Sequence, residues 1–209
     1  MAGSNECIII FTKFPVPGKV KTRLVPPLTK AEACKLYKSL VESTLKKAEK
    51  TGKRIIVCYY PAGSRAGFIR WLGKGVRYIP QKGAGLGSKM KNAFICAFGS
   101  GYDKVLLAGC DIPDLSAGQL KKDFKRLSGC DALLGPAKDG GYYMIGFNKK
   151  SFLPEVFSGI KWSTPSVLTR TLAILKKNNY RVSFSRELSD IDTAADILLR
   201  QAQKRKSYA

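Results

Sequence analysis

Basic side chains gather in the short segment FPVPGKVKTRL, which follows the first apolar run of this sequence. Together with the residue before it, the segment supplies Lys13, Lys19, Lys21 and Arg23. Because like charges repel, their crowding in one short segment indicates that an anion binds among them. We interpret the segment as a phosphate clamp, in which these side chains donate charge-assisted hydrogen bonds and Gly18 lets the backbone approach the anion. The alternative is a proline-stiffened connector with solvated lysines. The segment is not a P-loop, since Lys13 and Val20 stand where that motif needs glycine and Ser or Thr.

Carboxylates follow two other apolar runs. Asp111 is the first acid after KVLLAGC, and Asp190 and Asp192 alternate in SDIDTAAD, so in extended backbone their side chains point the same way. We predict that these three acids hold a metal ion. The sequence contains no histidine, so the ligands are oxygens, which favours Mg²⁺ or Mn²⁺. The alternatives are structural: Asp111 as a turn former, and Thr193 with Asp196 as a helix cap.

Two glycine-containing loops carry weaker signals. In QKGAGLGSKM the glycines admit a flat nucleobase and Gln81 offers a donor and an acceptor, although a flexible turn is the simpler interpretation. In KDGGYYMIG the Asp-Gly pair is typical of a hairpin turn, and Asp139 is also a candidate acid for binding an acceptor. Trp162 either packs in the core or covers a substrate.

The composition narrows the class of protein. The net charge is +22, from 37 Lys and Arg against 15 Asp and Glu, and it attracts polyanions such as nucleic acids, nucleotides and phosphosugars. Six cysteines stand singly, and without histidine they argue against zinc sites and against Cys-His or Ser-His-Asp catalysis. No stretch reaches the ~20 apolar residues of a membrane helix and no signal-peptide pattern is present, so we expect a cytoplasmic protein.

Apolar strands and amphipathic helices alternate along the chain. We predict strands at 7–13, 54–60, 76–80, 104–111, 131–137, 142–147 and 181–185. We predict helices after a Thr29–Glu32 capping box, at about 65–72, after GAGLGSKM, after Ser116, from Thr164-Pro165 to about 178, and in TAADILLRQAQK. This order indicates one α/β domain over residues 1–209 with a mainly parallel sheet. Ligands bind such sheets beyond the carboxyl ends of the strands, where the segments described above lie.

The combined motifs resemble those of a known family. In order, FTKFPVPGKVKTRL, QKGAGLGSKM, GCDIPDL, GPAKDGGYYMIG, WSTPSV and DIDTAAD are similar to a bacterial family of glycosyltransferase-like proteins with the nucleotide-diphospho-sugar transferase (GT-A-like) fold. The resemblance covers residues 7–200. More distantly, the chain resembles the guanylyltransferase of deazaflavin-cofactor biosynthesis and the molybdopterin nucleotidyltransferases. It departs from sugar-nucleotide pyrophosphorylases in its first loop, and it lacks an Asp-x-Asp motif, since Gly109 precedes Asp111 by two residues.

The resemblance implies a three-layer fold with a mixed, mostly parallel seven-stranded sheet that binds a nucleotide. It implies that the nucleotide contacts a set of residues from the first and third strands and their loops: Phe11, Lys13, Gly18, Lys19, Gln81, Gly85, Leu86 and Gly87. Lys21 and Arg23 would also hold phosphates. Asp111 would ligate the metal, with Asp190 or Asp192 completing the site.

We therefore expect a metal-dependent transferase with a nucleotide or nucleotide-sugar as partner. The resemblance favours glycosyl transfer from a nucleotide diphosphate-sugar, and nucleotidyl transfer from a nucleoside triphosphate is the alternative. Lys21, Arg23 and Asp139 are the expected catalytic residues. A basic nucleic-acid-binding module is a further alternative, but the sequence has no RNP1-like string or zinc finger, and a third is a non-catalytic ligand-binding member. The base, the acceptor and the oligomeric state stay open at this point.

Overall fold

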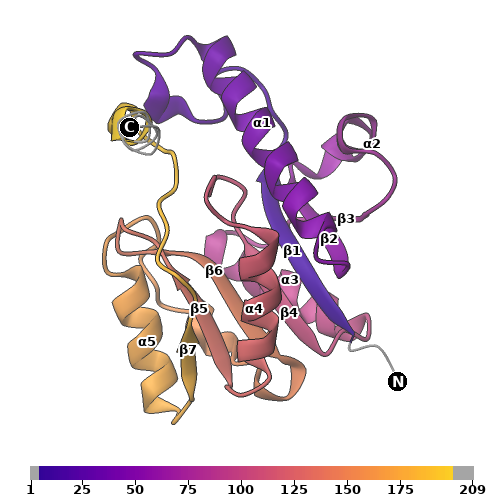
Figure 1. Cartoon of the computed structure of the whole chain (residues 1–209), viewed down its shortest axis with the longest axis vertical. Helices are drawn as coiled ribbons and strands as arrows, with labels where there is room; N and C mark the ends of the chain where they lie inside the picture. The colour runs from indigo at the N-terminus through magenta and orange to yellow at the C-terminus, as the bar shows by residue number, and fades with distance from the viewer. Residues whose placement is uncertain (1–4, 200–209) are drawn as a thin grey trace.

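The computed structural model describes residues 5–199, which form helical layers on both faces of a seven-stranded sheet (Figure 1). The strands are β1 (Glu6–Lys13), β2 (Arg54–Tyr60), β3 (Arg77–Pro80), β4 (Lys104–Ala108), β5 (Ala132–Pro136), β6 (Tyr142–Asn148) and β7 (Val182–Phe184). Their order in the sheet is β3-β2-β1-β4-β6-β5-β7. β6 is antiparallel to both of its neighbours and the other pairs are parallel. The predicted mixed, mostly parallel sheet is confirmed.

The main helices are α1 (Lys30–Glu49), α2 (Arg65–Leu72), α3 (Leu86–Gly99), α4 (Ala117–Leu127) and α5 (Val167–Lys177). Short 3₁₀ turns are η1 (Thr22–Leu24), η2 (Ala62–Ser64), η3 (Lys149–Ser151) and η4 (Pro154–Phe157). A last helical stretch covers 194–199. None of the described helices is both long and apolar enough to cross a bilayer.

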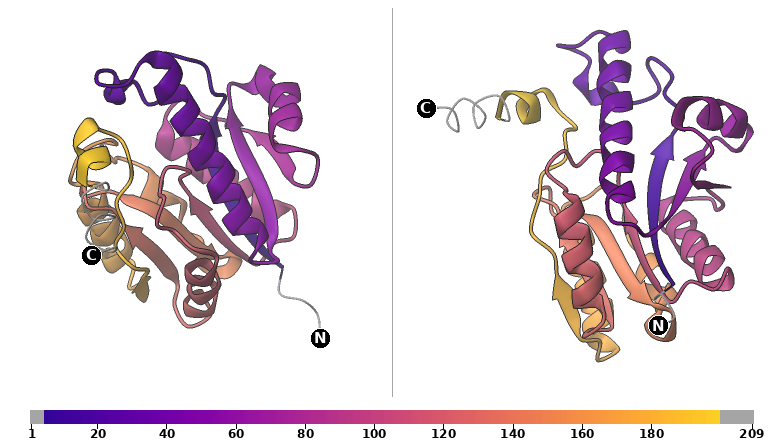
Figure 2. Two further views of the ribbon diagram at one scale, coloured as in Figure 1. Left: turned by 45° about the horizontal axis from the view of Figure 1, so that its top comes forward. Right: turned by 45° about the vertical axis from the view of Figure 1, so that its right-hand side comes forward.

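Helices cover both faces of the sheet (Figure 2). Alternating strand side chains bury an apolar layer beneath the helices of each face. On one face Ile8 and Ile10 of β1 pack beneath α1 and α4. On the other face Cys7 and Ile9 pack with α3, η4 and α5, where Phe94 stacks on Phe157 at a centroid distance of 5.8 Å. Of the six cysteines, five are buried and Cys96 is half-buried.

Local signals in the sequence fix several helix starts. Glu32 N donates to the Thr29 hydroxyl at 3.2 Å, and the Glu32 carboxylate accepts from Thr29 N at 2.8 Å, which completes the predicted capping box of α1. The Ser116 hydroxyl likewise accepts from Gln119 N at 3.1 Å and caps α4. These caps set where the loops before the helices end.

Three predicted boundaries differ from the structure by two residues or more. The helix expected after GAGLGSKM begins at Leu86, inside that motif. The helix expected from Thr164-Pro165 begins at Val167, because the Thr164 hydroxyl donates to the Lys161 carbonyl at 2.8 Å and so closes a turn before the helix. The strand expected at 104–111 ends at Ala108, after which the chain leaves the sheet and exposes Asp111 in a loop. The last predicted helix extends beyond the described residues after 199.

Candidate functional site

All of the segments singled out in the sequence lie at one edge of the sheet. The parallel strands β1, β3, β4, β5 and β7 end at this edge, and the antiparallel β6 begins there. The loops after β1, β3, β4 and β7 therefore converge with the β5–β6 hairpin. The edge on which these loops gather is the place where open α/β sheets bind ligands.

The loop after β1 turns Lys21 into the molecule. Lys21 Nζ donates to Asp111 Oδ2 at 2.9 Å and to Asp192 Oδ1 at 3.5 Å, and 5% of the lysine side chain is exposed. Arg23 donates to the other oxygen of Asp192 at 2.5 Å, and its side chain is 69% exposed. Two bases of the predicted clamp thus pair with the protein's own acids, which the sequence interpretation did not foresee. Lys13 and Lys19 stay exposed to solvent.

Asp192 comes within reach of Lys21 and Arg23 because the chain after β7 continues along the sheet edge. Leu188 forms a parallel bridge with the turn after β5 and is buried, as is Ile191. Ile191 N donates to the Asp111 carbonyl at 3.2 Å, which ties this segment to the loop after β4. Ile191 packs in a small core with Leu24, while its neighbours Asp190 and Asp192 both line a cavity. Their alternation in the sequence places them on the same side.

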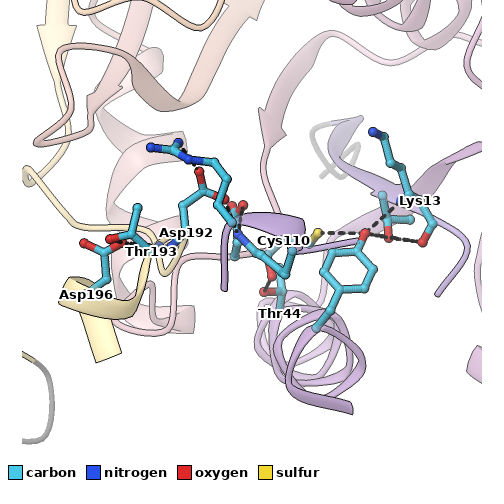
Figure 3. Close-up of polar contacts among 11 residues, drawn as sticks. Lys13, Thr44, Cys110, Asp192, Thr193 and Asp196 are labelled. Atoms are coloured by element: carbon cyan, nitrogen blue, oxygen red, sulfur yellow. Dashed lines mark hydrogen bonds and ion pairs between the residues drawn. The ribbon is translucent and has the colours of Figure 1, made fainter. Parts of the chain in front are cut away.

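Helix α1 fixes the ends of β1 and β4 through polar side chains (Figure 3). The Tyr37 hydroxyl lies 2.9 Å from Thr12 Oγ1 and accepts from Lys13 N at 2.8 Å, and Cys110 Sγ donates to it at 3.6 Å. Thr44 Oγ1 donates to the Cys110 carbonyl at 3.3 Å. The sequence analysis did not single out Tyr37. A buried tyrosine usually finds a polar partner, and that was the available signal.

The charges at the site shift the pKa values of two groups. Burial alone would lower the pKa of Lys21, but the charges of Asp111 and Asp192 more than offset it, so the pKa is raised. Burial and the nearby carboxylates of Asp111 and Asp139 raise the pKa of Asp190 to about 6. Burial is the larger cause of the second shift, and the negative charges of Asp111 and Asp139 add to it.

Two cavities of different chemistry adjoin at this edge. The smaller, about 330 Å³, is lined by Lys13, Lys19 and Lys21 from the basic loop. The larger, about 610 Å³, is lined by the acids Asp139 and Asp190 and by a set of aromatic and hydroxyl side chains: Tyr142, Tyr143, Trp162, Ser163 and Thr164. Both cavities share a wall made of Phe11, Arg23, Leu86, Gly109, Asp111 and Asp192. The basic loop and the acids thus line adjoining cavities.

The residues expected to contact a nucleotide divide into two groups. Phe11, Lys13, Lys19, Gln81 and Leu86 line the smaller cavity, whereas Gly18, Gly85 and Gly87 line neither. The amide Nε2 of Gln81 donates to the Thr12 and Cys58 carbonyls at 3.2 and 3.1 Å, so this side chain also joins the ends of β1 and β2.

Two of these three glycines, Gly18 and Gly87, have structural reasons of their own. Gly18 has a φ of +77°, a backbone conformation that side-chain-bearing residues rarely adopt. Gly87 allows α3 to pack closely, since a Cβ there would lie 2.3 Å from the Phe157 carbonyl oxygen and 2.8 Å from Trp162 Nε1. Gly85 is the N-cap residue of α3, where a Cβ would meet no other atom within 4 Å.

Asp139 and Trp162 each make a contact that stabilises the fold, and each also lines the larger cavity. Asp139 Oδ1 accepts from Gly141 N at 2.9 Å, as expected for a carboxylate in a tight turn, and the side chain lines the cavity. Trp162 packs edge-on against Tyr142 with a centroid distance of 6.3 Å and also lines the cavity. Tyr142, Ser163 and Thr164 also line the larger cavity, although the sequence analysis did not name them as site residues.

The acids suit a hard cation that brings oxygen ligands of its own. Within residues 5–199, no three His, Cys, Asp or Glu side chains are close enough to form a metal site by themselves. Asp111 and Asp192, however, already converge on one cationic atom, Lys21 Nζ. Mg²⁺ bound to a nucleotide commonly needs one or two protein carboxylates, because phosphates and water supply the other ligands. The metal-binding roles of Asp111, Asp190 and Asp192 stay a prediction.

Comparison with known proteins gives the fold and the family. Residues 44–164 match the family model described as "Uncharacterized protein conserved in bacteria (DUF2064)". The chain is 40% identical to a candidate nucleotide-diphospho-sugar transferase from Desulfovibrio desulfuricans G20, whose crystal structure aligns with a TM-score of 0.88 over 91% of this chain and 83% of that one. No curated protein matches the sequence.

More distant structures share the fold alone. A nucleotidyl transferase from Methanothermobacter aligns with a TM-score of 0.63 at 16% identity, over 98% of this chain and 100% of that one. Rv0371c from Mycobacterium tuberculosis H37Rv, crystallised in complex with manganese, aligns with a TM-score of 0.56 at 13% identity, over 92% and 96% of the two chains. The expected nucleotide-diphospho-sugar transferase fold is confirmed, and the chain belongs to the DUF2064 family.

Proposed function

We propose that this protein is a transferase that binds a nucleotide diphosphate-sugar across the carboxyl edge of its sheet and passes the sugar to a hydroxyl group of an acceptor. The observation that carries the proposal is the pair of adjoining cavities, one basic and one acidic, with Arg23, Asp111 and Asp192 in their common wall. In a nucleotide diphosphate-sugar the negative charge lies on the diphosphate, and the sugar beyond it is neutral. Such a donor fits a site that changes from basic to acidic along its length.

The nucleotide occupies the smaller cavity in this proposal. Lys13 and Lys19 lie there as exposed cations, and Lys21 and Arg23 lie at its border with the acids. Lysine and arginine form charge-assisted hydrogen bonds with phosphate oxygens. The diphosphate would therefore lie near the common wall, with the apolar side chain of Phe11 beside it.

The acceptor occupies the larger cavity. Asp139 and Asp190 line it together with Asp111 and Asp192, and Arg23 is the one basic residue among its described lining residues. Four of the chain's 15 acids thus face one space in a protein of net charge +22. The part of the cavity lined by Asp139 and Asp190, away from the common wall, repels phosphate and accepts hydrogen bonds from hydroxyl groups. The acceptor is therefore a hydroxyl compound rather than a phosphate ester.

The reaction exchanges one bond to the anomeric carbon for another. The acceptor oxygen forms a bond to that carbon, the bond from the carbon to the β-phosphate oxygen breaks, and the electron pair leaves with the nucleoside diphosphate. The hydroxyl proton passes to the carboxylate of Asp139 or Asp190. Lys21 and Arg23 stabilise the charge that grows on the leaving phosphate. A bound Mg²⁺ or Mn²⁺, held by Asp111 and Asp192, would supply further charge stabilisation.

Nucleotidyl transfer from a nucleoside triphosphate is the second candidate. The observations that favour it are the lysines of the smaller cavity, which suit a triphosphate, and the fold shared with proteins named as nucleotidyl transferases. In that reaction the acceptor attacks the α-phosphorus and pyrophosphate leaves. The acid wall of the larger cavity disfavours the phosphate-bearing acceptors that such a reaction would often use.

Product analysis separates the two reactions. The purified protein is incubated with Mn²⁺ and either UDP- and GDP-sugars or the four nucleoside triphosphates, together with a mixture of simple glycosides and polyols as acceptors. Release of a nucleoside diphosphate with a new glycoside supports the proposal. Release of pyrophosphate with a nucleotidylated product would replace it by the second candidate. Absence of nucleotide binding, alongside tight salt-sensitive binding of RNA or DNA, would refute both.

A further inference from the structure

Lys21 lies where two carboxylates meet. Its Nζ is 2.9 Å from Asp111 Oδ2 and 3.5 Å from Asp192 Oδ1, and 5% of its side chain is exposed. The two carboxylates are each about one-third exposed, at 33% and 32%. The buried ammonium group therefore pairs with both carboxylates at once, and the exposed part of each carboxylate faces the cavities.

The backbone is built to hold the ammonium group in this place. Lys21 has a φ of 47° and a ψ of 42°, a left-handed conformation that residues other than glycine adopt rarely. Its neighbours Val20 and Leu24 are buried, with 5% and 0% of their surface exposed, in separate apolar clusters. The loop is thus fixed on both sides of Lys21, and the side chain between the two anchors points inward.

The oxygen atoms that Lys21 binds are those that a divalent cation would need. Oδ2 of Asp111 and Oδ1 of Asp192 face a common point, and the ammonium group lies at that point. A cation held by both oxygens would stand within a few ångströms of Nζ, where two positive charges repel strongly. Lys21 and a metal ion therefore compete for the same pair of carboxylates.

We propose that Lys21 is an internal counter-ion that keeps Asp111 and Asp192 together in the absence of metal and is displaced from them when the metal–nucleotide complex binds. This inference rests on the proposed function. Once displaced, the ammonium group lies at the border of the smaller cavity, within reach of the phosphate that arrives with the metal. The same residue thus holds the metal ligands in the empty site and neutralises phosphate in the filled one. The protein alone binds the metal weakly, and the nucleotide and the metal bind together.

Binding of Mn²⁺ without nucleotide tests this competition. Lys21→Met removes the charge and keeps the length of the side chain, and Lys19→Met removes a charge from the same loop at an exposed position. Calorimetric titration, with electron paramagnetic resonance of free Mn²⁺ as a second method, is expected to show about tenfold tighter binding or more in Lys21→Met. The Lys19→Met variant is expected to bind like the wild type. Equal or weaker Mn²⁺ binding in Lys21→Met, including no detectable binding in either protein, overturns the inference.

A second measurement on the unmodified protein covers the case in which Lys21→Met fails to fold. Acetylation by a small amine-reactive reagent is followed for each lysine by peptide mass spectrometry, with and without millimolar Mn²⁺. Lys21 is expected to react slowly alone and several-fold faster with Mn²⁺, while the rate at Lys19 stays constant. No acceleration at Lys21 overturns the inference. The proposed function fails separately, if no nucleotide binds to the wild type in the presence of Mn²⁺.

Discussion

Replacement of Lys21 by methionine should destabilise the protein far more than its loop position suggests. The lysine makes ion pairs at 2.9 and 3.5 Å, and loss of its charge leaves Asp111 and Asp192 facing each other. Breaking a buried ion pair costs about 3–5 kcal/mol, and an exposed pair is worth about 0–1 kcal/mol. Here the lysine is buried and both acids are one-third exposed, so we expect an intermediate loss of about 2–3 kcal/mol.

Thermal unfolding measures this loss directly. For a chain of 209 residues, 1 kcal/mol corresponds to roughly 2–4 °C, so Tm should fall by roughly 4–12 °C. Lys19→Met is the matched control, and its unfolding free energy should stay within about 0.5 kcal/mol of the wild type. In an Asp111→Asn background the Lys21→Met change should cost less, by about 1 kcal/mol or more, because one of the two ion pairs is already absent. Equal melting of the Lys21→Met and Lys19→Met proteins would refute the reasoning.

Three further outcomes follow from the structure. Arg23→Ala should change the unfolding free energy by less than about 1 kcal/mol, because the Arg23 side chain is 69% exposed, yet weaken nucleotide affinity about tenfold in calorimetry. Hydrogen bonds from Arg181 lower the pKa of Asp131, so the stability lost in Asp131→Asn should be full at pH 7. In urea titrations this difference should begin to shrink as the pH falls below about 4 and should vanish only below the lowered pKa of the folded protein. Ser185→Ala should cost about 1–3 kcal/mol, because the hydroxyl donates to a carboxylate that is 0% exposed, whereas an exposed serine such as Ser158 should tolerate the same change.

Periodicity and turn chemistry allowed most of the fold to be predicted. Strands such as β2 and helices such as α2 match their predicted ranges, because each depends on its own residues and their immediate neighbours. The start of α5 was missed by two residues because a threonine hydroxyl can close a turn or cap a helix with equal ease. The end of β4 was missed because an apolar run continues past the last residue that pairs in the sheet.

The candidate site could be located from the sequence but its contacts could not be derived. The rule that ligands bind beyond the carboxyl ends of parallel strands was enough to bring the basic loop, Asp111 and the last acids to one edge. The pairing of Lys21 with Asp111 and Asp192 joins residues 90 and 171 positions apart, and it depends on how the chain after β7 crosses the sheet edge. The role of Gly87 was likewise hidden, because its close contacts are with η4 and Trp162, which are distant in the sequence.

Calorimetric titration of UDP and GDP into the wild type and Asp111→Asn, with and without Mn²⁺, tests most directly whether Asp111 supports metal-dependent binding of a nucleoside diphosphate. Asparagine keeps the shape of the side chain and suits the same loop, so a purely structural Asp111 would tolerate the change. We predict that at least one of the two nucleotides binds the wild type with Mn²⁺ and that this Mn²⁺-dependent binding is lost in Asp111→Asn. Nucleotide binding of equal strength in both proteins, or binding that is indifferent to Mn²⁺, would contradict the account.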